Sequence, residues 1–499
     1  MESASFSVLC EGIGLSESDV ATIRGQLQDT AYTSLRAFEV TAQVSLGASR
    51  VLVPPLNESI VRRNWSEACV QTPGCIIQPE TAEHVSKFVR MVDYFRIKFS
   101  VRSGGHSPNL GWSSIGSHGV LLDMQKMAQV DLSADAAVVS IGPGALWGDV
   151  MASLSSHRVS VVGGRIPNVG VAGLILGGGY SYLSGEFGTA ADNVKNFEVV
   201  LGNGSIVNAN SAENSDLFWA LKGGGPNFGI VTRFDMFTMP VHDVWYEVAI
   251  YSTDQASEVF DAFALWQTSD QFDPKASVTL FMSLDFITVG LLYSASTQRP
   301  TVFAPFQTLT PMQVVVPGID GTLAQVYQMA SASISTARLR HDYKGISTRI
   351  DADLNKSVYS IWRQKALAVR EVTGADQIFA LQAVPKSMVE AGIAKGGNPM
   401  SMQCENQQWW TTLADWADEK DDALVRSVAL ETCAEFERQS KERGLYLPFI
   451  FMNDASVDQN PLASYGEPSL RRLKDIAKIY DPAELFQKYQ NGGFLLCKS

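Results

Sequence analysis

The chain has 499 residues, of which 45% are hydrophobic and 10% aromatic, so it is too long for one hydrophobic core and too apolar to be disordered. We therefore expect two or three globular domains. Lysine and arginine number 39 against 52 aspartate and glutamate residues, which gives a formal charge of −13. An acidic chain without a long basic stretch is not expected to bind nucleic acid or an anionic membrane surface.

The sequence also bears on the compartment. No apolar stretch approaches the roughly 18 residues that a membrane span needs, and residues 1–14 lack the basic start and continuous apolar middle of a signal peptide. We expect a cytoplasmic or otherwise intracellular protein, with secretion as the alternative. Cys69 and Cys75 are expected to be free buried thiols, although an oxidising compartment would allow them to form a disulfide. No two histidines or cysteines share a ligand spacing, so no metal site is predicted.

In chain order, the residue pattern predicts a helix at 16–28 and then, from residue 75, strands that alternate with helices. A hairpin at 194–209 follows, because Asn203-Gly204 stands between two apolar runs. A short helix is expected at 216–221. The strands before the hairpin are expected at 76–79, 99–102, 120–123 and 137–141, with one helix capped by Thr81 and another at 145–155.

The character of the chain changes after Pro240. Residues 244–252 and 277–294 alternate apolar and polar side chains, which is typical of an antiparallel sheet with one wet face. Helices are expected near 254–268, 322–330 and 409–441, so this region reads as an α+β domain whose helices cover one side of the sheet. Trp409, Trp410 and Trp416 are interpreted as core residues on the last of these helices.

Two glycine-dense loops carry the strongest functional signal. The first is Val101-Arg102-Ser103-Gly104-Gly105-His106-Ser107, and the second runs from residue 163 to residue 180 with seven glycines. Without a Cβ, their N–H groups can approach an anion closely, which favours a pyrophosphate site. The histidine adds a neutral nitrogen nucleophile. Neither loop reads GxGxxG or GxxxxGK[ST], so the usual dinucleotide fingerprint and the P-loop are excluded, and tight turns remain the alternative for either loop taken alone.

The order of several motifs decides between these alternatives. They are Arg102-Ser103-Gly104-Gly105-His106-Ser107, Ile141-Gly142-Pro143-Gly144-Ala145, Val169-Gly170-Val171-Ala172-Gly173 with Gly177-Gly178-Gly179, Asp192-Asn193-Val194, Asp216-Leu217-Phe218-Trp219-Ala220-Leu221-Lys222-Gly223-Gly224 and Asn227-Phe228-Gly229-Ile230-Val231-Thr232. With them, residues 75–240 resemble the FAD-binding domain of the vanillyl-alcohol oxidase/PCMH superfamily, in its berberine-bridge-enzyme-like branch of covalent flavoprotein oxidases. Asn453-Asp454-Ala455 and Gln490-Asn491-Gly492-Gly493-Phe494 resemble the closing segment of fungal members, which often serve secondary metabolism.

The resemblance implies an α+β fold in two parts. A PCMH-type FAD-binding domain would occupy residues 1–241, with its core from about residue 70, and residues 453–499 would return to it. A substrate-binding domain with an antiparallel sheet covered by helices would occupy residues 242–452.

The resemblance also implies a cofactor and its contacts. FAD would be held by Arg102, Ser103, Gly104, Gly105, His106, Ser107, Val169, Gly170, Gly173, Gly177, Gly178, Gly188, Asp192 and Ile230. His106 stands where relatives attach the flavin covalently. Many relatives also bond it through a cysteine, and the corresponding residue here is Ile166. We therefore expect attachment through His106 alone, without a second cysteinyl link.

On the substrate side, the resemblance places a small organic molecule between the flavin and the second domain's sheet. A base would remove a proton, a hydride would pass to the flavin, and O2 would reoxidise it. Sheet segments are expected at 379–383 and 400–405, and on the second of these Gln403 and Glu405 share one face. Relatives often carry a carboxylate base where Gln403 stands, so Glu405, Asn453 and Tyr465 are further candidates. The alternative for Glu405 is a solvated strand residue.

Four functional classes are weighed at this stage. The first is an FAD-dependent oxidase in secondary metabolism, which we favour. The second is a cyclase that uses the flavin scaffold to orient a polyene or polyketide without net oxidation. A flavin-binding module without catalysis is disfavoured by the size of the second domain, and a reductase using NAD(P)H by the absence of a second nucleotide motif.

Overall fold

The first sheet carries the first glycine loop. The computed structural model describes residues 4–28, 33–333, 335 and 337–499. In it, β2 and β3 flank β4 in parallel, and β1 pairs with β2 antiparallel. The strands are β1 (Val51–Leu52), β2 (Cys75–Ile77), β3 (Phe99–Arg102) and β4 (Val120–Asp123). The helices α1 (Ala4–Gly12), α2 (Glu17–Gln28), α3 (Ser34–Leu46), α4 (Glu58–Val61) and α5 (Ala82–Phe95) accompany them.

The expected start of α5 is confirmed in detail. Thr81 has an extended backbone, and its hydroxyl accepts a hydrogen bond from the N–H group of His84, so it caps the helix. Val85, Phe88 and Val92 lie on the buried face of α5, which packs on α3 and the first sheet. The apolar periodicity therefore identifies the covering helix correctly.

A second sheet supports the other glycine loop. Its five antiparallel strands follow the order β5-β6-β9-β7-β8. The hairpin expected at Asn203-Gly204 is confirmed, since Val200 pairs with Ile206 across the turn. The strands are β5 (Val130–Leu132), β6 (Val138–Ile141), β7 (Val194–Val200), β8 (Ile206–Asn210) and β9 (Ile230–Phe237), and the helices are α6 (Trp147–Ser155), α7 (Val171–Leu176), α8 (Ser184–Phe187) and α9 (Ser215–Leu221).

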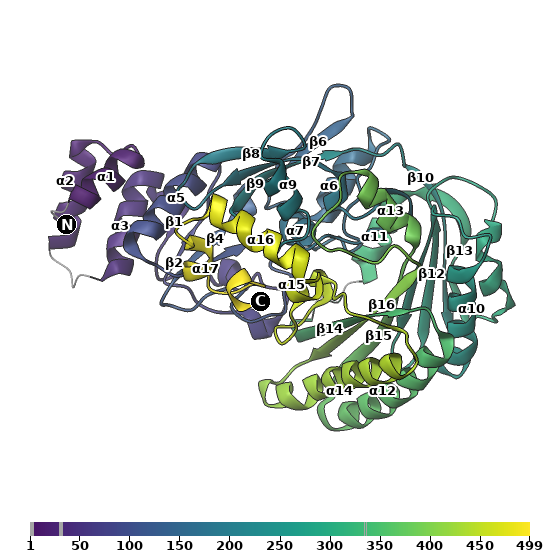
Figure 1. Ribbon diagram of the computed structural model, residues 1–499. Coiled ribbons are helices and arrows are strands. Elements are labelled where there is room, and N and C mark those ends of the chain that lie inside the picture. Colours follow the sequence, from purple (N-terminus) through teal and green to yellow (C-terminus); the bar gives the residue numbers. More distant parts are fainter. Residues whose placement is uncertain (1–3, 29–32, 334, 336) are drawn as a thin grey trace.

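The third sheet has eight antiparallel strands in the order β13-β10-β12-β11-β15-β16-β14-β17. Figure 1 shows helices along one of its faces, while the other turns toward the first two sheets. The strands are β10 (Asp243–Tyr251), β11 (Ala276–Met282), β12 (Ile287–Tyr293), β13 (Gln313–Thr322), β14 (Arg340–Arg349), β15 (Asp376–Val384), β16 (Gln407–Trp416) and β17 (Tyr446–Leu447). The helices of this region are α10 (Ala256–Thr268), α11 (Leu323–Ser333), α12 (Ala352–Thr373), α13 (Lys386–Ala394) and α14 (Asp422–Glu442). The predicted α+β class is confirmed.

Two expectations for the third sheet are wrong. The helix expected at 409–441 is instead β16 followed by α14, and the strand expected at 400–405 is irregular chain that precedes β16. β16 is a central strand with residues buried on both faces, so its apolar run lacks the alternation that marks a half-buried strand. Trp409, Trp410 and Trp416 are core residues, as expected, but on this strand.

The C-terminal segment lies against the first two sheets (Figure 1, yellow). The hydroxyl of Tyr480 donates to Asp216 Oδ1 at 2.7 Å, and the N–H group of Asn491 donates to the carbonyl of Phe99 at 2.7 Å. Its helices are α15 (Pro461–Ser464), α16 (Glu467–Tyr480) and α17 (Leu485–Tyr489). The end of the chain therefore packs beside β3, from which the first glycine loop departs.

Cys69 and Cys75 are free thiols in the structure, and both are buried. Burial raises the pKa of the Cys69 thiol to about 12, which keeps it protonated at neutral pH. None of the described helices is both long and apolar enough to cross a membrane.

Candidate functional site

The two glycine loops touch one another. A Cβ added to Gly104 would lie 2.5 Å from the backbone nitrogen of Gly170, and one added to Gly170 would lie 2.3 Å from that of Gly104. Real Cβ atoms do not approach backbone this closely, so both positions require glycine. Gly170 also immediately precedes α7, so the first loop is held against the start of that helix. The contact makes one continuous backbone surface out of two segments that are far apart in sequence.

A cavity of about 710 Å3 lies between this surface and the bare face of the third sheet. Ligand pockets usually have volumes of this size. Most of the predicted cofactor residues line it, and they are Ser103, Gly104, Gly105, His106, Ser107, Val169, Gly170, Gly173, Gly177 and Ile230. Asn453 and Ile166 line it too.

Four predicted cofactor residues lie outside the cavity wall. Arg102 points into the protein, where it is 1% exposed and pairs with Asp123 at 3.2 Å. Gly178 lies behind the loop, where an added Cβ would meet Met400. Gly188 adjoins Asp192, whose carboxylate accepts hydrogen bonds from Thr189 and Asn398. These four residues hold the shape of the loops, and their direct contact with FAD stays a prediction.

The structure does not bring the four candidate catalytic residues together. Gln403 is exposed, and Glu405 forms an ion pair with Arg349 at 3.0 Å; neither lines the cavity. The hydroxyl of Tyr465 donates to the carbonyl of Gly223 at 3.0 Å within the core. Only Asn453 reaches the cavity, where it accepts from Gly179 N and donates to the carbonyl of Gly173. These two bonds secure the second glycine loop, so Asn453 positions backbone there.

His106 lies in a stack of aromatic rings. The centroid of its imidazole lies 4.1 Å from that of the Trp65 ring, with an angle of 11° between the ring planes. The imidazole of His341 stacks on the same indole, with a centroid distance of 3.8 Å and an interplanar angle of 0°. His341 Nδ1 is 2.6 Å from Asp415 Oδ1. Burial and the neighbouring His341 lower the pKa of His106 to about 3, so its imidazole is neutral at physiological pH. A neutral ring nitrogen keeps the lone pair that a nucleophile needs.

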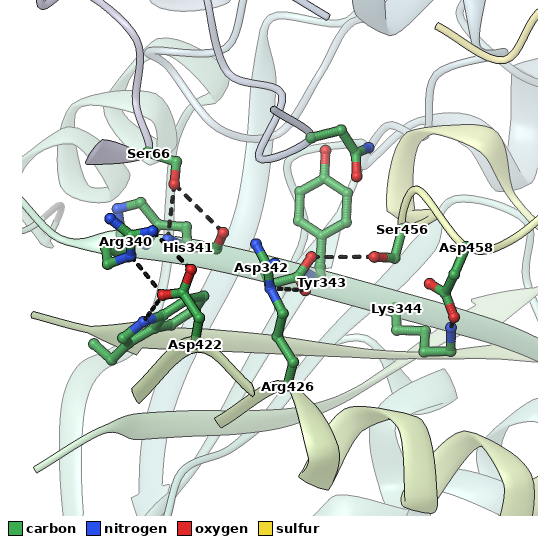
Figure 2. A network of polar contacts seen from close by, with 12 residues as sticks. Ser66, Arg340, His341, Asp342, Tyr343, Lys344, Asp422, Arg426, Ser456 and Asp458 are labelled. Atoms are coloured by element: carbon green, nitrogen blue, oxygen red, sulfur yellow. Dashed lines mark hydrogen bonds and ion pairs between the residues drawn. The ribbon is translucent and has the colours of Figure 1, made fainter. Parts of the chain in front are cut away.

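Strand β14 supplies His341 to this stack, and Figure 2 shows that residue with its neighbours on the strand. His341 and Tyr343 line the cavity, whereas the alternate residues Asp342 and Lys344 lie in polar contacts on the other side. Asp342 pairs with Arg426 at 3.0 Å and accepts from Ser456, and Lys344 pairs with Asp458. Because one residue of slip would exchange the two sets, these partners hold the register that presents the imidazole and the phenol to the cavity.

A second polar group crosses the cavity from the second glycine loop to the sheet. Arg165 donates to Gln382 Oε1, and Gln382 Nε2 donates to Asp454 Oδ2 at 2.5 Å. The Arg165 guanidinium also lies over the ring of Tyr180, 4.6 Å from its centroid. Burial raises the pKa of Asp454 to about 6, while the bond from Gln382 and the charge of Arg165 act in the opposite direction.

Sequence reasoning missed this second group and the His341–Asp415 pair. Their members come from segments separated by tens to hundreds of residues, and no local spacing joins them. The motif Asn453-Asp454-Ala455 was the available signal, but Asn453 was named as the catalytic candidate and the adjacent carboxylate of Asp454 was not.

The cavity fits FAD chemically. Its glycine surface leaves room for backbone N–H groups to meet phosphates, and nothing lies within 4 Å of the position that a Cβ on Gly173 would take. Asn168 Oδ1, in the cavity wall, is buried without a hydrogen-bond partner among the described residues. Within that same part of the chain, no three His, Cys, Asp or Glu side chains gather as a metal site would require.

Comparison with known proteins agrees with this geometry. Residues 73–210 match the FAD binding domain family. An FAD-dependent monooxygenase of Arthrobotrys oligospora is 36% identical over 86% of this chain and 84% of its own length. Berberine bridge enzyme from Eschscholzia californica shares the fold, with a TM-score of 0.73 at 16% identity over 91% of this chain and 98% of that one. Glucooligosaccharide oxidase from Acremonium strictum has a TM-score of 0.75 at 18% identity, over 91% and 98%.

The fold and the cavity thus define an FAD-dependent oxidoreductase with a berberine-bridge-like architecture. The chain belongs to the family of FAD-binding proteins that includes the fungal FAD-dependent monooxygenases. The resemblance drawn from the motifs is confirmed.

The burial of Arg102 generates a stability prediction. Arg102→Met leaves the fully buried Asp123 without its cation, which is expected to cost about 3–5 kcal/mol of unfolding free energy. Urea unfolding measures it. Arg158→Met is the matched control, because Arg158 is 67% exposed where it pairs with Asp243, and its loss is expected to cost less than about 1 kcal/mol. Equal effects of the two substitutions would contradict the assigned role.

Proposed function

We propose that the protein is an oxidase of a small organic molecule in fungal-type secondary metabolism, with FAD attached through His106 and O2 as the electron acceptor. One observation carries the proposal: a carboxylate, Asp454, lines the cavity, where Gln382 of the sheet donates a hydrogen bond to it. When bound, FAD supplies the hydride acceptor. The side chains supply binding, orientation and proton transfer.

His106 supports covalent attachment. Its imidazole is neutral and is held at the cavity wall by the Trp65 stack, so His106 would hold FAD through a ring nitrogen whose lone pair is available for a bond. The glucooligosaccharide oxidase of Acremonium strictum carries a 6-S-cysteinyl, 8α-N1-histidyl FAD. Here Ile166 lines the cavity and none of the six cysteines does, which supports a single histidyl link.

Asp454 is the group best placed to accept the substrate's proton. In the folded protein its pKa of about 6 leaves the carboxylate mostly ionised at neutral pH. This pKa is also close to the pH of the solution, as efficient general-base catalysis requires. Gln382 donates to one carboxylate oxygen, so the other remains to receive the proton.

The histidyl link is tested by denaturation. Flavin fluorescence is expected to stay with the wild-type band in a denaturing gel and to be lost from His106→Ala, because the alanine has no nucleophile. His118→Ala, an exposed histidine, is the matched control and is expected to keep the flavin. Complete release of FAD from the wild type would sink the covalent assignment.

The general base is tested by the pH profile. An ionised Asp454 accepts a proton and a protonated one does not, so kcat/KM is expected to rise through pH 6 and to be lost below it. Asp454→Asn removes this limb and lowers kcat/KM by about 10^2- to 10^4-fold. Asp475→Asn, on the exposed face of α16, serves as the control. An unchanged limb in Asp454→Asn would reject this base.

The acceptor is tested by stoichiometry. An oxygen electrode and a peroxide assay on a panel of alcohols, amines, phenols and polyketide-like compounds are expected to show one O2 consumed and one H2O2 formed for each molecule oxidised. Product without O2 consumption would favour the cyclase. Incorporation of labelled oxygen into the product would favour a monooxygenase, as the names of the fungal relatives suggest.

A further inference from the structure

We propose that the substrate is an acidic phenol or enol with an apolar body, and that Arg165 holds its oxygen as an oxyanion while Asp454 takes the proton. The inference rests on the proposed function for the role of Asp454, and it adds the chemical class of the substrate. In this step the substrate O–H bond breaks, an Asp454 O–H bond forms, and the negative charge stays on the substrate oxygen beside the guanidinium.

Arg165 is a cation whose charge the protein leaves available. Among the described residues that line the cavity, it is the one lysine or arginine, and no carboxylate there forms an ion pair with it. A guanidinium has five N–H donors, and the bond to Gln382 uses one of its nitrogens. The ring of Tyr180 supports its flat face and leaves the edge free. A fixed guanidinium edge is suited to an oxygen anion.

Gln382 keeps the cation and the carboxylate apart. Its amide accepts from Arg165 on one side and donates to Asp454 on the other, so the two charged groups flank a single side chain instead of pairing directly. In a direct ion pair, Arg165 and Asp454 would neutralise each other and neither would be available to a substrate. Separated by one amide, they can act on one hydroxyl group from two sides, since a base takes the proton while a cation stabilises the oxygen left behind.

Beyond Gln382, the part of the sheet wall along β15 is apolar. Along β15, Ile378, Ala380 and Gln382 face the cavity by the period of two, and Gln382 is the polar end of this row. On the neighbouring strands, Phe281 of β11 pairs with Ala380, and Leu413 of β16 pairs with Ile378. Phe281 and Leu413 also line the cavity. The row from Gln382 to Ile378 spans roughly 13 Å at the usual strand rise. It therefore accommodates a ring with an alkyl or polyene chain better than a sugar.

The partners of Arg165 favour substrate over cofactor, although the residue itself belongs to the second glycine loop. Its guanidinium contacts Gln382 of β15 and the ring of Tyr180, whereas the surface that would receive the pyrophosphate is built from backbone around Gly104 and Gly170. The charge is thus directed toward the wall where the apolar row ends.

The test measures binding to the flavin-loaded protein, so it does not depend on turnover. 4-Nitrophenol and its neutral methyl ether, 4-nitroanisole, are titrated against the flavin absorption spectrum across pH 5–9. The phenol is expected to bind as the phenolate, with its pKa lowered on binding. Arg165→Gln is expected to weaken phenolate binding by about 10- to 100-fold and to leave 4-nitroanisole unchanged. Arg165→Lys, which keeps the charge but not the planar fork, is expected to fall between.

Controls separate this inference from the proposed function. Arg158→Gln, outside the cavity, is expected to change neither affinity, and Asp454→Asn is expected to keep phenolate binding even if turnover is lost. An octyl chain on the nitrophenol ring is expected to tighten binding, and Ile378→Asn to reverse that gain. Equal binding of phenol and ether by the wild type would overturn the proposal. So would loss of bound flavin in Arg165→Gln with its fold intact, which would assign the cation to the cofactor.

Discussion

The approach of Gly104 to Gly170 is the constraint on which the site depends. Two loops from different sheets meet there without a side chain between them, and a methyl group at either position would force them apart. Their contact brings His106 and the start of α7 to one wall of the cavity. The buried pair of Arg102 and Asp123 fixes the first loop from behind, and Asn453 fixes the second.

The opposite wall has a different physical basis. The eight-stranded sheet is covered by α10, α12 and α14 on one face, where aromatic residues such as Phe379 and Trp410 form the core. Its other face is left for the cavity, where Gln382 and His341 are each held by a polar partner. The sheet therefore provides a rigid, mostly apolar wall with a few fixed polar groups, which is typical of a ligand site.

Much of the cofactor side could be predicted from the sequence, because its residues lie in short contiguous loops. The hairpin at Asn203-Gly204 and the helix capped by Thr81 were also legible, since local rules govern both. The substrate side was not. Because β16 is buried on both faces, its sequence lacks the alternation of apolar and polar residues that identifies a strand. Gln403 and Glu405 were therefore placed on a strand, although that strand begins only at Gln407. Arg165, Gln382 and Asp454 meet through tertiary packing alone, and no sequence spacing records that.

The stack of His106, Trp65 and His341 joins the two walls. Trp65 belongs to the loop-bearing half, His341 belongs to the sheet, and Ser66 Oγ accepts a hydrogen bond from the His341 N–H group at 2.9 Å. The environment of the anchor histidine is thus built partly by the substrate half of the molecule. The two halves are therefore not independent modules. If the sheet were replaced by that of a relative, the new sheet would need an aromatic ring at position 341 to stack on Trp65. Without that ring, His106 would lose its alignment with the new pocket.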